Sequence, residues 1–328
     1  MPMLSSTIET LRPLPAEVSL EENLGLWDVL QQYEQQYGGL DAAATAEEVE
    51  MTDAAEEKTV DQGARELHLQ RYVDDYFARF HHQWPLLHRP AFQPDTEPRF
   101  LVLSMVMVSL WTSGEARAQD AAVQMHERFI VMLHEQRDKW DVSYARAEGR
   151  KAIWPMGIYQ SILLQVIFAM MRSNTDEHAN KSRPWLPLAM HELLGRVVKS
   201  CLRLGMFQYS RMLDQYSHVG FAFLTWVYVE EVKRFGLMLF RVWTLCYGAS
   251  SMFSVSELRF PLPESDYLWE ADAIGELVRR REKEVGEGSG VREEEQFWIA
   301  NLGIDGLELA LSWRHLANSK GQGARVLT

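Results

Sequence analysis

Residues 66–80 read ELHLQRYVDDYFARF, and this stretch decides the fold class. Large apolar side chains recur in it at intervals of three and four positions: Leu69, Tyr72, Val73, Tyr76, Phe77 and Phe80. Such spacing places a single apolar stripe along an α-helix. The stretch therefore predicts an amphipathic helix that packs one face against a larger core.

Helical patterning continues through the rest of the chain. Residues 118–140 and 191–204 repeat the same spacing, and residues 100–111 and 158–171 are apolar at nearly every position. Residues 221–246 predict one or two long helices. Since no long run alternates apolar and polar residues, nothing argues for a sheet. We predict an all-α fold, a large irregular helical bundle.

An acidic N-terminal arm over residues 1–65 precedes the body. Residues 1–66 carry 15 Asp and Glu and three Lys and Arg, a net charge of −12, whereas the remaining residues carry a net charge of −1. An arm with this charge repels phosphate, which disfavours contact with nucleic acid. Its segment 42–57, rich in Ala, Glu and Asp, predicts disorder.

The arm also predicts one acidic amphipathic helix, over about residues 20–37. Its stripe consists of Leu20, Leu24, Trp27, Leu30, Tyr33 and Tyr37. Two roles stay open for it: an activation or docking helix that binds a partner, or a helix that packs on the body of its own chain. The helical domain is predicted over residues 66–320, with a flexible loop at 282–295 and a polar tail at 321–328.

Cysteine usage and hydropathy exclude two classes of protein. The two cysteines, Cys201 and Cys246, are too few for a cysteine-based zinc site, and their scarcity fits a reducing compartment. No secretory signal is visible at the start of the sequence. The most membrane-like stretch, Phe235–Val255, holds Arg241 near its middle, which is costly in a bilayer. We therefore predict a buried helix there and no membrane association.

Enzyme motifs are incomplete wherever they begin. Asp74 and Asp75 start like the DDxxD diphosphate motif of helical cyclising enzymes, but no acid follows at the fifth position. His191 begins like HExxH without its second histidine. The group His81, His82 and His88 has no carboxylate at metal-ligand spacing. We predict no catalytic, cofactor-binding or metal-binding residues and no enzymatic activity. A helical biosynthetic enzyme with a diverged metal motif at Asp74 and Asp75 is the alternative.

Residues 76–92, YFARFHHQWPLLHRPAF, carry a family resemblance. They resemble the opening of the fungal-specific transcription factor domain, the middle homology region of fungal zinc-cluster and zinc-finger regulators, which typically reads YFxxFHPxxPLLHRPTF. Here His82 replaces a proline and Ala91 a threonine. In this stretch a proline-pinned turn is expected to bring Leu86, Leu87 and Phe92 into the bundle.

Three further segments resemble the same family in the same order. Residues 203–207, RLGMF, are similar to its RxLGLF helix end, where Gly205 would be a left-handed C-cap. Residues 226–234, WVYVEEVKR, are similar to WxxxExxRR, with Glu230 and Arg234 expected as a surface pair worth about 0.2–0.5 kcal/mol. Residues 260–271, from FPLP to LWEA, complete the set.

The resemblance implies a transcription regulator in a fungal nucleus, controlling a metabolic or secondary-metabolite gene cluster. Family members normally carry a zinc module upstream as the DNA reader, and this sequence shows none. Binding to DNA is therefore expected to be indirect, through other transcription regulators or coactivators, and a homodimer or heterodimer is among the expected assemblies. The run Arg279–Lys283 is either a nuclear-import signal or a solvated helix end. A truncated relic of a regulator is a further alternative.

Overall fold

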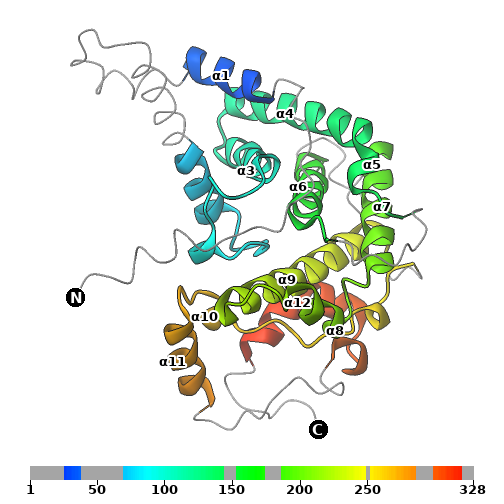
Figure 1. Cartoon of the computed structure of the whole chain (residues 1–328). Helices are drawn as coiled ribbons and strands as arrows, with labels where there is room; N and C mark the ends of the chain where they lie inside the picture. Colours follow the sequence, from blue (N-terminus) through cyan, green and yellow to red (C-terminus); the bar gives the residue numbers. More distant parts are fainter. Residues whose placement is uncertain are drawn as a thin grey trace, which may run out of the picture. The chain divides into compact units, whose positions relative to one another are not determined.

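The computed structural model describes residues 26–37, 69–143, 153–173, 186–248, 252–285 and 298–319. Within these ranges the regular secondary structure is helical (Figure 1). Two isolated β-bridges, Gln208 to Arg259 and Pro261 to Trp298, are the β-type pairing there. The predicted all-α class is confirmed. Of the acidic arm, residues 26–37 are described, and the segment 42–57 lies outside the described residues.

The described residues divide into two compact units. The first contains residues 26–37, 69–83 and 93–140, and the second contains residues 84–92 together with the described residues from 141 onward. The family resemblance spans both units. The predicted domain limits at residues 66 and 320 lie outside the described residues, so they stay predictions.

The first unit is built around the helix over 69–79. Its predicted stripe is confirmed, since Val73, Tyr76, Phe77 and Phe80 are all buried. The hydroxyl of Ser109 donates a 2.6 Å hydrogen bond to the carbonyl of Tyr72, which ties this helix to the next one. The other helices of the unit are α1 (Leu26–Tyr37), α3 (Arg99–Thr112), α4 (Ala116–Glu135) and α5 (Arg137–Trp140).

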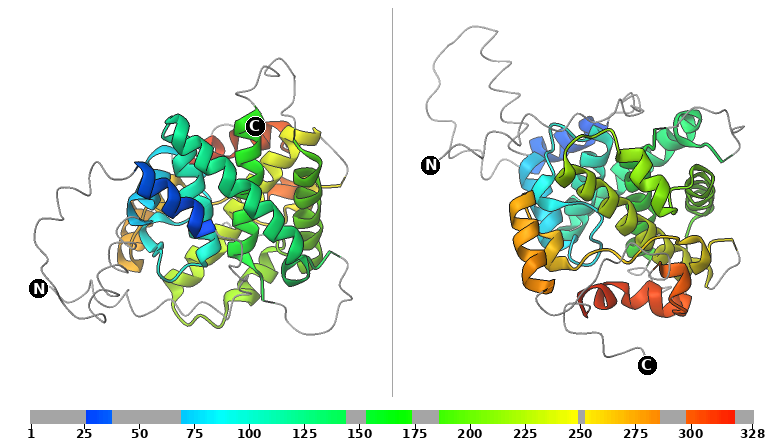
Figure 2. Two further views of the ribbon diagram at one scale, coloured as in Figure 1. Left: turned by 90° about the horizontal axis from the view of Figure 1, so that it is seen from above. Right: turned by 60° about the horizontal axis from the view of Figure 1, so that its bottom comes forward.

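Packing in the first unit follows the hydropathy of each helix. Helix α3 is buried from Phe100 to Leu110, whereas α4 buries one face and exposes the other. Helices α1 and α3 both pack against α4, and α1 lies along α4 in both views of Figure 2. The indole N–H of Trp140 donates to the carbonyl of Leu133 and anchors the short α5 to the end of α4.

The second unit contains the most deeply buried helices of the described chain. Helix α6 is buried at every position from Met156 to Met170, and α9 from Val227 to Phe240. Residues 221–246, where one or two helices were predicted, form the single helix α9. The helices and short turns of this unit are η2 (Arg89–Ala91), α6 (Met156–Ser173), α7 (Leu188–Leu204), α8 (Tyr209–Tyr216), α9 (Ala222–Tyr247), η3 (Val255–Glu257), α10 (Asp266–Trp269), α11 (Ile274–Val285), η5 (Ile299–Asn301) and α12 (Gly306–Ser319).

Two glycines of the second unit have specific structural roles. Gly205 ends α7 with φ +68°, and Met206 N–H bonds to the carbonyl of Cys201 at 3.0 Å, which confirms the predicted left-handed C-cap. Gly236 lies inside α9, where a Cβ would come within 3.1 Å of the Phe207 ring and 3.3 Å of the Phe260 ring. The missing side chain at this position therefore lets two aromatic rings approach the helix backbone.

The apolar stretch Phe235–Val255, for which a buried helix was predicted, belongs to this unit. Helix α9 ends at Tyr247, before the stretch is complete, and the guanidinium of Arg241 lies 4.4 Å from the centre of the Trp84 ring. Among the described residues, none of the helices has both the length and the apolar character that a membrane span requires.

Candidate functional site

Three motifs that are far apart in the sequence meet at one place in the second unit. They are the segment 84–92, helix α9, and the segment 260–271 that leads into α10. The residues that they bring together, called the buried charge cluster below, are His88, Trp226, Glu230, Glu231, Lys233, Arg234, Glu264, Asp266 and Trp269.

Helix α9 supplies four charged side chains of this cluster from its buried stretch. Its residues from Val227 to Phe240 are all buried, so a charged side chain in that range is largely withdrawn from bulk water. Glu230 and Arg234 are 1% and 0% exposed. Charges in such a place must be paired and hydrogen-bonded, because an isolated buried charge is very costly.

Glu230 is bonded through both of its carboxylate oxygens. Oε1 accepts a 2.6 Å hydrogen bond from the ammonium of Lys233, and Oε2 accepts a 2.9 Å bond from the backbone N–H of Glu264. Burial lowers the pKa of Lys233, but the negative charges of Glu230, Tyr209 and Glu264 together with the hydrogen bond to Glu230 outweigh burial, so the pKa of Lys233 is raised overall. The ammonium form of Lys233 is therefore favoured inside the protein.

Arg234 is held by a carbonyl, a carboxylate and an indole ring. Its guanidinium donates to the backbone carbonyl of Glu264 at 2.9 Å and to Asp266 at 3.4 Å. It lies 4.4 Å from the centre of the Trp269 ring, within the range of a cation–π contact. Burial lowers the pKa of Arg234, against the opposing effect of the Glu230 and Asp266 carboxylates.

Asp266 links the cluster to the last described helix. One carboxylate oxygen accepts bonds from Arg314 Nε at 2.6 Å and from Asn318 Nδ2 at 2.8 Å, both on α12. Burial would raise the pKa of Asp266, but the bond from Asn318 and the charges of Arg234 and Arg314 lower it below its usual range. The carboxylate thus connects α9, α10 and α12.

His88 is the contribution of the proline-rich turn. Its backbone N–H donates a 2.9 Å hydrogen bond to Glu231 Oε1, and its side chain is fully buried. The ring lies edge-on to Trp269 with 4.5 Å between centroids, and to Trp226 with 5.8 Å. Its Nδ1 accepts from the N–H of Ala91 and so caps the short η2 turn. His88 therefore packs against two indole rings and caps the η2 turn.

The structure overturns the expectation of a surface pair at Glu230 and Arg234. The two side chains are buried, and their hydrogen bonds run to residues outside the pair. The sequence also missed Glu264 and Asp266, which are separated from Arg234 by 30 and 32 positions. Charged residues within the apolar α9 run were the one signal that could have indicated burial.

The residues of the enzyme alternative lie on a solvated face of the first unit. Asp74 is exposed and accepts a 3.0 Å hydrogen bond from Gln70, while Asp75 forms a 3.3 Å ion pair with Arg79. These contacts run along one helix surface, as expected for a solvated face. They give no support to a diphosphate-binding site.

The histidines considered as metal ligands lie in different surroundings. His81 is buried and packs its ring against Phe77 at 5.1 Å between centroids, whereas His82 is exposed. In α7, His191 Nδ1 lies 2.7 Å from the hydroxyl of Tyr247. The part of the chain that the structure describes holds no group of three or more His, Cys, Asp or Glu side chains placed to bind a metal ion.

The basic run of α11 is largely engaged in ion pairs. Arg280 bonds to Glu276, Arg281 pairs with Glu264 at 3.0 Å, and Arg279 is 75% exposed. Helix α11 continues to Val285, so the first four positions of the predicted loop 282–295 are helical, while the others lie outside the described residues.

The amphipathic helix of the arm packs on its own chain. Helix α1 contacts α4 within the first unit, and Leu26, Val29 and Leu30 are buried. Of the predicted stripe, Leu30 and Tyr33 face the body, and the side chains of Trp27 and Tyr37 lie outside the described residues. Positions 20–25 of the predicted helix lie outside the described residues.

The geometry defines the class of the protein. Its sequence motifs hold helices together through a buried network of charges and aromatic rings, which is the behaviour of a structural helical domain. The matches to known proteins give the same answer: the model of the family "Fungal specific transcription factor domain" matches residues 73–295, and the chain belongs to this family.

Curated relatives agree with that assignment. The chain is 25% identical over 209 residues to "Zinc finger protein zas1" of Schizosaccharomyces pombe, covering 61% of this chain and 21% of that protein. It is 26% identical over 231 residues to the "Nicotinate catabolism cluster-specific transcription factor" of Emericella nidulans, covering 66% and 24%. The chain thus spans about a quarter or less of the length of these relatives. No solved structure matches it.

Proposed function

We propose that this chain is the regulatory helical domain of a fungal transcription regulator and that it acts without catalysis. The observation that carries the proposal is the convergence of three family motifs on the buried charge cluster. The family-like segments are therefore also neighbours in space, because His88, Arg234 and Trp269 contact one another or shared neighbours in one folded site.

The proposed setting is the nucleus, and the proposed target is a metabolic or secondary-metabolite gene cluster. A relative named as specific for the nicotinate catabolism cluster supports such a target class. The two cysteines are buried and unpaired with each other, so these 328 residues provide no cysteine-based zinc module. A DNA reader would lie outside them, and other regulators or coactivators are the proposed partners.

The test is chromatin immunoprecipitation of the tagged chain in its own host, combined with transcript profiling after deletion of its gene. Discrete promoter peaks and altered transcripts of one gene cluster are expected. Complementation with the Lys199→Ala variant, at an exposed position of α7, should restore the transcripts, whereas Arg234→Ala, which breaks the buried charge cluster, should not. A stable chain without promoter enrichment and with an unchanged transcriptome would refute the proposal and leave a relic or a different activity.

A further inference from the structure

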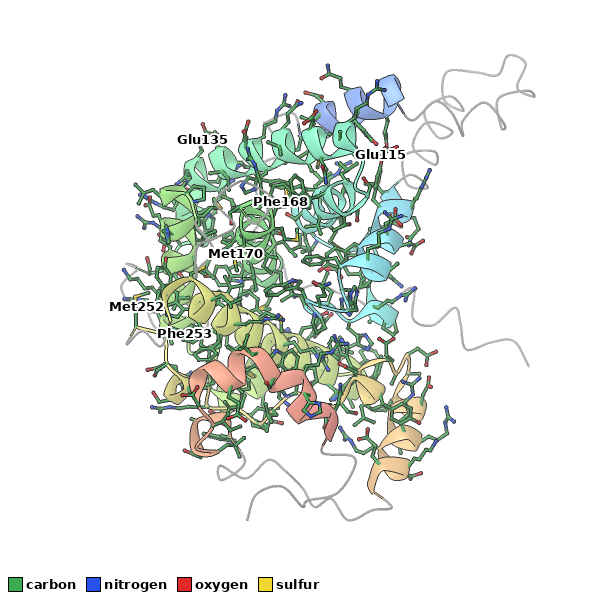
Figure 3. The ribbon with its side chains drawn as sticks, turned by 180° about the vertical axis from the view of Figure 1, so that it is seen from behind. Glu115, Glu135, Phe168, Met170, Met252 and Phe253 are labelled. Atoms are coloured by element: carbon green, nitrogen blue, oxygen red, sulfur yellow. The ribbon has the colours of Figure 1, made fainter. Side chains whose placement is uncertain are left out.

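Helix α11 buries one of its faces in the second unit. Its Leu277 is 2% exposed and packs with Leu268 and Ala271 in a small core cluster. On another face, Ile274 and Val278 are each 47% exposed, although both side chains are large and apolar. Figure 3 shows side chains projecting from the outer side of α11, the faint orange helix. The helix therefore carries an exposed apolar pair one turn apart.

A glycine lies beside this apolar pair. Gly275 is exposed, and a Cβ built on it would meet nothing within 4 Å. Since successive residues are turned by about 100° around a helix, Ile274 and Val278 both lie on one flank of Gly275. A glycine at the centre of a face lets a second helix approach closely, because the distance between packed helices depends on the side chains at the contact.

Charged residues occupy the other flank of Gly275. Arg279 is 75% exposed and lies 3.3 Å from Glu276, and the exposed Asp272 forms a hydrogen bond with the same glutamate. Glu276 thus keeps Asp272 and Arg279 on one side of α11, at opposite ends of this surface. The residues called the α11 face below are Asp272, Ile274, Gly275, Val278 and Arg279. This face has an apolar flank, a charged flank, and opposite charges at its two ends.

The α11 face is complementary to itself when a second copy is turned end for end. About a two-fold axis at Gly275, each flank meets the same flank of the second copy with its direction reversed. Ile274 of one copy then meets Val278 of the other, and Asp272 of one copy meets Arg279 of the other. A two-fold contact requires this property, since residue i meets residue j on both sides of the axis.

The surroundings of Asp272 favour such a contact. A hydrogen bond with Glu276 raises the pKa of Asp272, and Glu276 itself pairs with Arg279 and Arg280. A nearby opposite charge stabilises the ionised form of a carboxyl group. Arg279 of a second copy would supply that charge to Asp272.

We propose that the α11 face is the contact between two copies of this chain, packed antiparallel about a two-fold axis at Gly275. The apolar flanks exclude water at the contact, and the two pairs of Asp272 with Arg279 set the direction of the helices. One helix face is smaller than a standard protein interface, so we expect a weak dimer with a Kd on the order of 100 μM. The inference does not depend on a role in transcription.

Charge exchange across the axis tests the antiparallel arrangement. Asp272→Lys puts like charges into both pairs, and so does Arg279→Glu. Sedimentation equilibrium of the full chain should therefore show about 10-fold weaker self-association for each variant than for the wild type. An equal mixture of the two variants should associate as tightly as the wild type, because every pair in the mixed dimer again joins opposite charges. Lys199→Glu, at an exposed position of α7, is the control and should leave association unchanged.

Cross-linking gives a second measurement, which needs no change of charge. In a Gly275→Cys variant the thiols of the two copies lie at the crossing point of the helices, so mild oxidation should link the copies in pairs. The native Cys201 and Cys246 are buried. A Lys199→Cys variant, whose thiol is exposed on α7, should stay largely unlinked under the same conditions.

Each remaining outcome overturns the proposal. A wild-type chain that stays monomeric well above the expected Kd would leave the α11 face to another protein. Dimers that neither charge variant weakens would use another surface, and a mixture that fails to recover would show that Asp272 and Arg279 do not meet across an axis. Equal linking of the two cysteine variants would mean that the copies meet by chance collision.

Discussion

Helices α9 and α11 both carry a glutamate followed four positions later by an arginine, and the two pairs behave differently. In α11, Glu276 and Arg280 form a direct ion pair at 2.5 Å on a helix whose outer face is exposed. In α9, Glu230 and Arg234 are completely buried and bond to other residues. The same spacing gives a local surface contact in one helix and long-range links in the other.

The difference shows that the surroundings of a motif decide its role. Arg280 bonds to Glu276 of its own helix and to the carbonyl of Tyr267, 13 positions earlier in the neighbouring α10, so its contacts stay close in the sequence. Arg234 holds the chain near Glu264 and Asp266 in place, which makes it a link between segments. The buried pair should therefore be the more sensitive one, and the following substitutions test this contrast.

The largest effect is expected for Arg234→Ala. Removing the guanidinium leaves buried oxygens without a donor and a gap beside Trp269, and breaking a buried charge pair typically costs about 3–5 kcal/mol. Urea denaturation should show this loss of unfolding free energy, with Arg279→Ala, a 75% exposed arginine, as the matched control. Equal effects of the two substitutions would contradict a structural role for the cluster.

A glycine in each helix sharpens the comparison. Gly236→Ala in α9 places a Cβ 3.1 Å from the Phe207 ring, and overpacking of this kind typically costs about 1–3 kcal/mol. Gly275→Ala in α11 meets nothing within 4 Å and should instead stabilise the helix by about 0.5 kcal/mol. Thermal unfolding shows whether each variant is less or more stable than the wild type. A stabilising Gly236→Ala would mean that the Phe207 and Phe260 rings move aside easily.

Sequence patterns predicted most of the fold because helix formation depends on local spacing. The stripe from Val73 to Phe80 and the left-handed cap at Gly205 need only neighbouring residues to be recognised, and both are confirmed. In α1 the prediction named Leu30, which is buried, and did not name Leu26 and Val29, which are buried as well.

The site was harder to predict because its hydrogen bonds join residues that are far apart in the sequence. His88 and Glu231 are 143 positions apart, and no local period relates them. The four family-like segments did mark the right parts of the chain. Their physical connection, a buried network that joins the proline-rich turn, α9 and α10, required the folded structure.

A smaller effect, dependent on pH, should arise from Asp266. Its pKa is lowered in the folded chain by the bond from Asn318 and by the two arginines, despite burial, so its ionised form favours folding. This stabilisation is complete above the ordinary pKa of about 3.9 and is lost as the pH falls through the lowered value. Asp266→Asn should therefore destabilise the chain at pH 7 and make less difference near pH 3.

Chemical denaturation at several pH values measures this dependence. Asp272→Asn, two positions before α11, is the comparison, because a shared hydrogen bond raises the pKa of this exposed carboxyl and lowers the pKa of Glu276. Since the two shifts are opposite, this variant should show a much flatter pH dependence than Asp266→Asn. Parallel profiles would show that the surroundings assigned to Asp266 are wrong.

The smallest effect is expected for Arg280→Ala. Its pair with Glu276 lies on one helix with side chains 16% and 23% exposed, so the substitution should cost about a third or less of what Arg234→Ala costs. Part of the effect should be lost in 1 M salt, because pairs that retain contact with water are screened, whereas the Arg234→Ala effect should not change. Urea midpoints at low and high salt decide the matter. A large, salt-independent loss at Arg280 would mean that α11 is as much a structural link as α9, and that helix burial does not separate the two pairs.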